Sequence, residues 1–104
     1  EKMNKLVRDN IPDIIKQTGD KPDFVILDSP DYYNELKKKL TEEVSEFNDS
    51  DEIMELCDVV EVISAILDYK NIGDEEFEKM RSAKNKANGK FEKRIFLNGV
   101  DRMK

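Results

Sequence analysis

The sequence contains no histidine and no tryptophan, and its single cysteine is Cys57. Without histidine, the chain has no Ser-His-Asp or Cys-His catalytic group and no imidazole ligand for zinc. A single cysteine excludes an internal disulfide and a cysteine-rich zinc site, and it suits a reducing cytosol. Catalysis is therefore left to carboxylates, lysine, tyrosine, or a metal ion bound by oxygen atoms.

Long apolar segments are absent as well. No apolar run approaches the ~20 residues that span a bilayer, and the start of the sequence lacks the apolar core of a signal peptide. We therefore expect a cytoplasmic protein with no membrane partner. The formal net charge is −6 and the pI is about 4.8, whereas nucleic-acid-binding domains usually carry a basic surface. We expect no nucleic-acid partner either.

Charged residues make up 40% of the 104 residues, and hydrophobic residues make up 38%. The apolar residues recur at helical spacing, which predicts one all-α domain over residues 1–104. We expect an antiparallel bundle of about four helices with short loops and short extended segments. The helices should begin near residues 10, 28, 51 and 75 and end near residues 19, 47, 69 and 86, with extended segments at 24–27 and 91–100.

The third expected helix is apolar nearly all round in its second half. One face of this helix is lined by Ile53, Leu56, Cys57, Val60, Ile63 and Leu67. The apolar surface is extended around the second half of the helix by Val59, Val62, Ala65 and Ile66. Such a helix is central in a bundle or lies at a subunit interface. Because Cys57 belongs to this apolar set, we expect it to pack against other residues and not to act as a nucleophile.

Acidic residues recur at a three-residue spacing on the two central helices. Glu43 and Glu46 share one face of the second helix, and Glu55 and Asp58 share one face of the third. If the chain reverses at residues 48–50, with Ser50 as the next N-cap, facing residues have a constant index sum. Glu46 then faces Glu55 and Glu43 faces Asp58, so the carboxylates form two levels about 4.5 Å apart.

A cation is the natural partner of these four carboxylates. Glu43 falls beside the apolar stripe of its helix, where a carboxylate is costly unless it is paired or bound to metal. Four converging carboxylates repel one another without a cation. Mg²⁺ suits them because it prefers oxygen ligands and bridges to phosphates, with Mn²⁺ as the alternative ion. The competing interpretation is a set of solvated surface acids, since Glu-x-x-Glu is common in helices.

Over nearly its whole length the chain resembles the MazG-like, all-α nucleoside triphosphate pyrophosphatase superfamily, and within it the branch similar to phosphoribosyl-ATP pyrophosphohydrolase. Four segments carry the resemblance. Residues 5–12, Lys-Leu-Val-Arg-Asp-Asn-Ile-Pro, are similar to the N-terminal signature of that branch, with Asn10 where a lysine is usual. Residues 42–46 and 55–58 are similar to the two metal-binding half-motifs. Residues 88–91, Asn-Gly-Lys-Phe, resemble the end of the fourth-helix motif, where Arg-Gly-Gly-Phe is usual.

The resemblance implies a hydrolase that cleaves the α–β phosphate bond of a nucleoside triphosphate, giving a monophosphate and pyrophosphate, as a house-cleaning enzyme. It implies Mg²⁺ at Glu43, Glu46, Glu55 and Asp58, and a homodimer or homotetramer. Lys84 matches a lysine expected on the fourth helix, and Arg81 precedes it by three residues on the same face. Lys5 and Arg8 belong to the N-terminal signature. These four cations are the candidates for binding the substrate's phosphates.

Two alternatives to this function remain open at the level of the sequence. A sister enzyme would use the same metal site to hydrolyse phosphoribosyl-ATP in histidine biosynthesis. A non-catalytic helical dimerisation module would instead show neither Mg²⁺-dependent stabilisation nor pyrophosphate release. Glu42 and Glu61 are expected to support the metal ligands or to lie on the surface.

Overall fold

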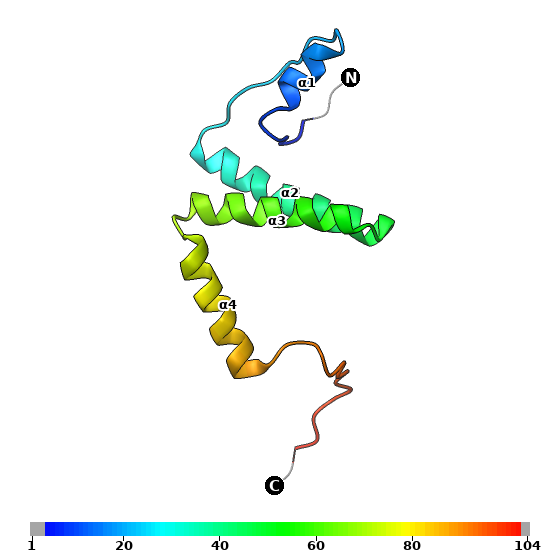
Figure 1. Cartoon of the computed structure of the whole chain (residues 1–104), viewed down its shortest axis with the longest axis vertical. Helices are drawn as coiled ribbons and strands as arrows, with labels where there is room; N and C mark the ends of the chain where they lie inside the picture. The colour runs from blue at the N-terminus through cyan, green and yellow to red at the C-terminus, as the bar shows by residue number, and fades with distance from the viewer. Residues whose placement is uncertain (1–3, 103–104) are drawn as a thin grey trace. The chain divides into compact units, whose positions relative to one another are not determined.

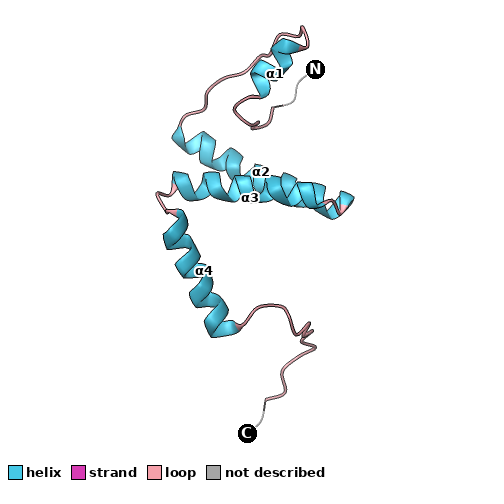
Figure 2. Ribbon diagram, in the orientation of Figure 1, coloured by secondary structure: helices cyan, strands magenta, loops and turns pink. Residues whose placement is uncertain are grey.

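The computed structural model describes residues 4–102, and these residues form four α-helices and no strand, so the predicted all-α fold is confirmed. Figures 1 and 2 show the helices, which are α1 (Ile11–Gln17), α2 (Ser29–Ser50), α3 (Ile53–Tyr69) and α4 (Asp74–Asn88). The chain divides into two compact units, residues 1–71 and residues 72–104. Each unit is described by itself.

Helix α2 begins where the sequence predicted and ends later. At its start the Asp28 carboxylate accepts a hydrogen bond from the backbone N–H of Asp31 at 3.1 Å, and Pro30 lies in the first turn, both typical of a helix N-terminus. The expected turn at residues 48–50 is helical. The chain reverses at Asp51, which adopts the left-handed conformation with φ 58° and donates its N–H to the carbonyl of Phe47.

The expected cap of α3 is therefore wrong. Because α2 continues through Ser50, the N-cap position falls to Glu52, and the Ser50 hydroxyl accepts a hydrogen bond from the Glu52 N–H at 3.2 Å. Helix α4 begins one residue before the expected start near residue 75. Gly73 is the N-cap and Asp74 is the first helical residue, where its negative charge favours the helix dipole.

Helices α2 and α3 form an antiparallel hairpin in which they pack along each other (Figure 1). Within residues 4–102, the buried apolar side chains are Leu36 of α2 and Val62 of α3. The buried core is therefore small and lies midway along the hairpin. Val62 belongs to the residues that extend the expected apolar face of the third helix, whereas Ile53 and Val60 of that face itself are exposed.

The two apolar faces of α3 have different environments. The side with Val62 packs toward α2, whereas Ile53 is 71% exposed and Val60 is 62% exposed. Cys57 lies on this outer side and is exposed, so the prediction that it packs is wrong. Helix α2 covers the side of α3 that carries Val62, and the apolar side chains of Ile53 and Val60 stay exposed.

Residues 4–10 precede α1. Leu6 of this segment is half-buried, and so are Ile11 and Pro12 at the start of α1. Helix α1 ends at Gln17, and Gly19 follows with φ 90°, a conformation that glycine adopts without strain. Residues 24–27 form no strand, and Phe24, Val25 and Ile26 are exposed. The expected extended segment is thus an irregular connection between α1 and α2.

The second unit contains α4 and the segment that follows it. Helix α4 ends at Asn88, two residues after the expected end near residue 86, and Gly89 follows with φ 81°. Residues 90–102 have no helix or strand, and Phe91, Ile95, Phe96 and Leu97 are all exposed. Among the helices of residues 4–102, none combines the length and the apolar character needed to cross a membrane.

Candidate metal centre and adjoining pocket

Glu43 is the one charged residue that is buried in the described part of the chain, with a residue exposure of 5%. Its Oε1 atom lies 3.1 Å from the Lys39 Nζ atom, one helical turn earlier on α2. Its Oε2 atom is buried and has no hydrogen-bond partner among residues 4–102. A buried carboxylate oxygen left without a donor is costly, so this position favours a ligand that contacts Oε2.

Further carboxylates converge on Glu43 from both helices. Glu43, Glu55 and Asp58 each offer an oxygen, and these three atoms lie within 4.8 Å of one another; Glu42, Glu43 and Glu46 form a second such group. Glu43 belongs to both groups. The structure therefore brings the four predicted ligands together around Glu43, with Glu43 close to Asp58 as the antiparallel register predicted.

The arrangement fits a hard cation such as Mg²⁺. All of the donors are carboxylate oxygens, which Mg²⁺ and Ca²⁺ prefer. Two oxygens on opposite sides of one Mg²⁺ ion lie about 4.2 Å apart, twice a metal–oxygen bond of about 2.1 Å. Adjacent ligands lie about 3.0 Å apart in the same octahedron, so the three oxygens, which lie within 4.8 Å of one another, would move inward to bind one ion together.

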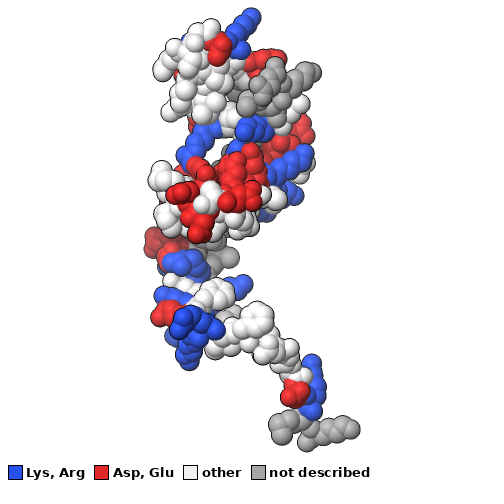
Figure 3. All heavy atoms as spheres, turned by 90° about the vertical axis from the view of Figure 1, so that its right-hand side faces the viewer, with Lys and Arg blue, Asp and Glu red and all other residues white. Residues whose placement is uncertain are grey.

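The pKa of Glu46 reflects the close approach of these carboxylates. A contact with Glu43 raises the pKa of the Glu46 carboxyl above its ordinary value of 4.5, and the charges of Glu43, Glu55 and Glu42 act in the same direction. Like charges disfavour ionisation because each new negative charge is repelled by its neighbours. Figure 3 shows acidic side chains gathered over the end of the α2–α3 hairpin that faces the viewer.

Basic side chains contact the acidic residues from two elements. The Arg8 guanidinium, from the segment before α1, lies 2.6 Å from the Asp58 Oδ1 atom. Lys39 contacts Glu42 and Glu43 at 3.1 Å each, and Lys5 lies 3.6 Å from Glu42. Burial acts to lower the pKa of Lys39, but the hydrogen bonds to Glu42 and Glu43 outweigh it and the pKa is raised.

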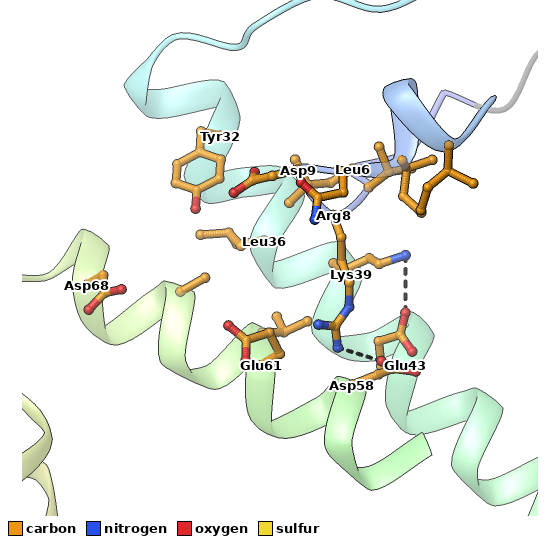
Figure 4. A pocket seen from close by; sticks show the side chains of 16 residues that line it. Leu6, Arg8, Asp9, Tyr32, Leu36, Lys39, Glu43, Asp58, Glu61 and Asp68 are labelled. Carbon is orange, nitrogen blue, oxygen red and sulfur yellow. Dashed lines mark hydrogen bonds and ion pairs between the residues drawn. The ribbon is translucent and has the colours of Figure 1, made fainter. Parts of the chain in front are cut away.

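A pocket of about 630 Å³ opens beside this acidic group, entirely within residues 1–71 (Figure 4). Its walls come from the segment before α1, from α1 itself, and from the facing sides of α2 and α3. Glu43, Asp58, Arg8 and Lys39 line one end. A volume of this size is typical of sites that hold small organic ligands.

No family model matches the chain, and no curated protein or solved structure is significantly similar to it. Membership of the MazG-like superfamily therefore stays a prediction. Because a fold alone does not specify an activity, the assignment of function depends on the residues of the acidic group and the pocket.

The two predicted phosphate-binding residues of the second unit, Lys84 and Arg81, lie on the exposed surface of α4. Arg81 donates two hydrogen bonds to the Glu78 carboxylate, at 2.6 Å and 3.2 Å. This contact raises the pKa of Arg81 and lowers the pKa of Glu78. A contact between either cation and a substrate stays a prediction.

Lys39 is the residue of the site that the sequence analysis missed. Its contact with Glu43 could have been predicted, because a lysine four residues before a glutamate lies on the same helix face. That signal is weak in a chain with 18 basic and 24 acidic residues, where such pairs are frequent. Glu42 was expected to support the metal ligands or to lie on the surface; Lys5 and Lys39 contact its two oxygens, and it also belongs to one of the two carboxylate groups that could hold a cation, so its role stays a prediction.

Proposed function

We propose that the chain is a Mg²⁺-dependent nucleoside triphosphate pyrophosphohydrolase. It cleaves the bond between the α and β phosphates and releases a nucleoside monophosphate and pyrophosphate. The observation that carries this proposal is the buried Glu43 carboxylate, whose unpartnered Oε2 lies among further carboxylates at the end of a ligand-sized pocket. An acidic site of this kind can accept a polyanionic substrate only with a cation between them.

Glu43, Glu46, Glu55 and Asp58 would hold the cation, Mg²⁺ in the first place and Mn²⁺ as the alternative. When bound, Mg²⁺ supplies charge neutralisation of the phosphates and activation of a water molecule for attack on phosphorus. The residues' own contribution is to present oxygen ligands from two helices that are fixed against each other. Burial of Glu43 keeps this ligand in one position and excludes water from one side of the site.

Arg8 and Lys39 border the same end of the pocket and are the nearest candidates for contacts with the substrate's phosphates. Arg8 is 56% exposed at its side chain, so it can turn from Asp58 to a phosphate oxygen at low cost. Guanidinium groups bind phosphate through two parallel hydrogen bonds. Lys5, Arg81 and Lys84 are the further candidates for such contacts.

The reaction balances with water as the only co-substrate. The water oxygen forms a new bond to phosphorus, and the bond between phosphorus and the bridging oxygen breaks. The bond's electron pair leaves with the departing phosphate group, and the water proton is released to solvent. The charge that develops on the leaving group is the charge that Arg8 and Lys39 are positioned to offset.

The uncovered apolar face of α3 supports a homodimer or a homotetramer. Ile53, Leu56 and Val60 are exposed on this face and carry no charge, and a contiguous apolar surface of this kind often marks a subunit interface. A Val60→Glu substitution should shift the protein to monomers in analytical ultracentrifugation. Val25→Glu, at an exposed apolar residue outside α3, is the matched control and should leave the assembly intact.

The decisive experiment measures pyrophosphate release from a panel of nucleoside triphosphates, with Mg²⁺ and with a chelator. Phosphoribosyl-ATP belongs in the panel because it separates the general hydrolase from the sister enzyme. Asp58→Asn should lower turnover by about 100-fold or more, because several kcal/mol of charge stabilisation are lost. Asp49→Asn removes the same charge from an exposed position on α2 and should keep wild-type turnover.

Two results would contradict the proposal in different ways. Wild-type turnover in Asp58→Asn would refute the assignment of the metal ligands. Absence of Mg²⁺-dependent pyrophosphate release from every nucleotide in the panel would refute the enzyme and favour the non-catalytic helical module.

A further inference from the structure

The pocket extends well beyond the acidic group, along the hairpin. On α2, its wall is formed by Glu43, Lys39, Leu36 and Tyr32, which are spaced by four, three and four residues and therefore share one helix face. These positions span about 16 Å along the axis. A phosphate group at the acidic end would leave most of this length to another part of the ligand.

The chemistry of the wall changes along its length. After the acidic end come the apolar side chains of Leu36, Val62 and Ala65, midway along the hairpin. At the far end lie Tyr32 of α2 and Asp68 of α3, and Asp9 approaches from the segment before α1 (Figure 4). The pocket thus offers an anion-binding end, an apolar middle, and a far end with one aromatic ring and two carboxylates.

Asp9 and Asp68 line the pocket but are exposed to solvent; they have no ion pair or side-chain hydrogen bond within residues 4–102, and they belong to neither of the carboxylate groups that could share a cation. An ionised carboxylate only accepts hydrogen bonds. A ligand that displaces water from this end is therefore best matched to it when it presents N–H or O–H donors. A ring carbonyl in the same position would be repelled by the carboxylate charge.

We infer that the far end of the pocket selects nucleobases with an exocyclic amino group, with Asp68 and Asp9 accepting the amino hydrogens and Tyr32 contacting the ring. This inference rests on the proposed function, because it places the triphosphate at the acidic end. It names the substrate class as amino-bearing nucleotides, with bases that carry a carbonyl at the same position as the disfavoured class. Planar rings stack favourably on a tyrosine face, whatever the base.

Matched nucleotide pairs test the inference, because within each pair the base differs only at the exocyclic group and at the adjacent ring nitrogen, which is an acceptor beside an amino group and an N–H donor beside a carbonyl. CTP and UTP differ by an amino group against a carbonyl, and so do ATP and ITP. We expect the amino member to have a kcat/KM about 10-fold or more above its partner, since a hydrogen bond to a charged group is gained and a repulsion is avoided. The Asp68→Asn and Asp9→Asn variants should bring this ratio toward one, mainly by lowering the efficiency of the amino member.

Asp49→Asn is the matched control, and it should keep the wild-type ratio. Thermal unfolding of each variant separates a local change in recognition from a loss of fold. Equal efficiency of both members of each pair in the wild-type protein would overturn the inference and leave the hydrolase intact. An unchanged ratio in both the Asp68→Asn and the Asp9→Asn variant would also overturn the inference. The same holds if these variants change only the preference between ribonucleotides and deoxyribonucleotides, because the carboxylates would then contact the sugar. Failure of every nucleotide would remove the proposed function, and this inference with it.

Discussion

The two units of the chain differ in the sign of their net charge and in how far apart in the sequence their ion-paired residues lie. Residues 1–71 contain 18 acidic and 9 basic side chains, whereas residues 72–104 contain 6 acidic and 9 basic ones. In the first unit, Arg8 contacts Asp58, 50 positions away in the sequence. In the second unit, the described pairs join residues within one turn of α4, such as Arg81 and Glu78.

This difference separates charges that depend on the fold from charges that do not. A pair within one helical turn forms in any helix with that sequence. The contacts of Arg8 and Lys5 exist only when the N-terminal segment lies against the hairpin. The acidic group of the first unit is therefore the place where folding, ion binding and substrate binding can influence one another. Changes there should have larger and more specific effects than changes on α4.

The largest effect is expected from Glu43→Gln. We expect Mg²⁺ to raise the melting temperature of the wild-type protein, because an ion that binds only the folded state stabilises it. The gain is about 2.7 kcal/mol at an ion concentration 100 times the dissociation constant. Glu43→Gln should abolish most of this gain in a thermal melt with and without millimolar Mg²⁺. Glu35→Gln, on the same helix and paired only with Lys38, should retain it.

Arg8→Gln should have a smaller effect in the opposite direction. Arg8 and a cation compete for Asp58, so removing the guanidinium should strengthen Mg²⁺ binding by about 2- to 5-fold, a range expected for a largely exposed ion pair. Titration of the melting temperature with Mg²⁺ measures this change. The same variant should bind nucleotide more weakly if Arg8 contacts phosphate. Unchanged affinities for both ligands would mean that the contact with Asp58 has no role in the site.

Glu46→Gln should flatten the dependence of stability on pH. The pKa of Glu46 is raised in the folded protein above 4.5, so the folded state binds this proton more tightly than the unfolded chain does. The resulting stabilisation is complete below pH 4.5 and is lost as the pH rises through the folded pKa. Unfolding measured without divalent ions between about pH 4 and pH 7 should show this loss in the wild type and less of it in the variant. Identical profiles would contradict the coupling to Glu43.

The smallest effect is expected from Arg81→Gln. The Arg81–Glu78 contact is as short as the Arg8–Asp58 contact, 2.6 Å in both cases, yet it is local to α4. We expect no measurable change in melting temperature and no change in Mg²⁺ affinity. A change in Mg²⁺ affinity as large as that of Arg8→Gln would remove the distinction between the two units. A loss of turnover alone would support the predicted phosphate contact of Arg81.

Much of the site could be predicted because it depends on helical spacing. The positions of Glu43, Glu46, Glu55 and Asp58 follow from two three-residue spacings and one chain reversal, and the burial of Glu43 follows from its place beside the apolar stripe. The chain reverses at Asp51 and not at the expected residues 48–50. This displacement changed the facing positions of the carboxylates little, because carboxylates on facing helices tolerate a shift of part of a helical turn. The expected register of Glu43 with Asp58 therefore survived the error.

Other features depend on contacts between elements, which spacing does not reveal. Cys57 was expected to pack because it is flanked by apolar residues, but only one side of α3 contacts α2. The far end of the pocket combines Asp9, Tyr32 and Asp68 from three separate segments. Their proximity depends on how the N-terminal segment lies on the hairpin, and no local pattern encodes that placement.

The burial of Glu43 places the stability of the fold in conflict with activity. A leucine at position 43 would extend the apolar contacts of Leu36 and Val62, and it would remove the cost of an unsatisfied oxygen, so the isolated fold should gain in stability. The same replacement would take away the acid at the centre of both carboxylate groups. Selection for stability alone would therefore erase this glutamate, and its persistence in a lineage would be a direct sign that the chain is maintained for what it binds.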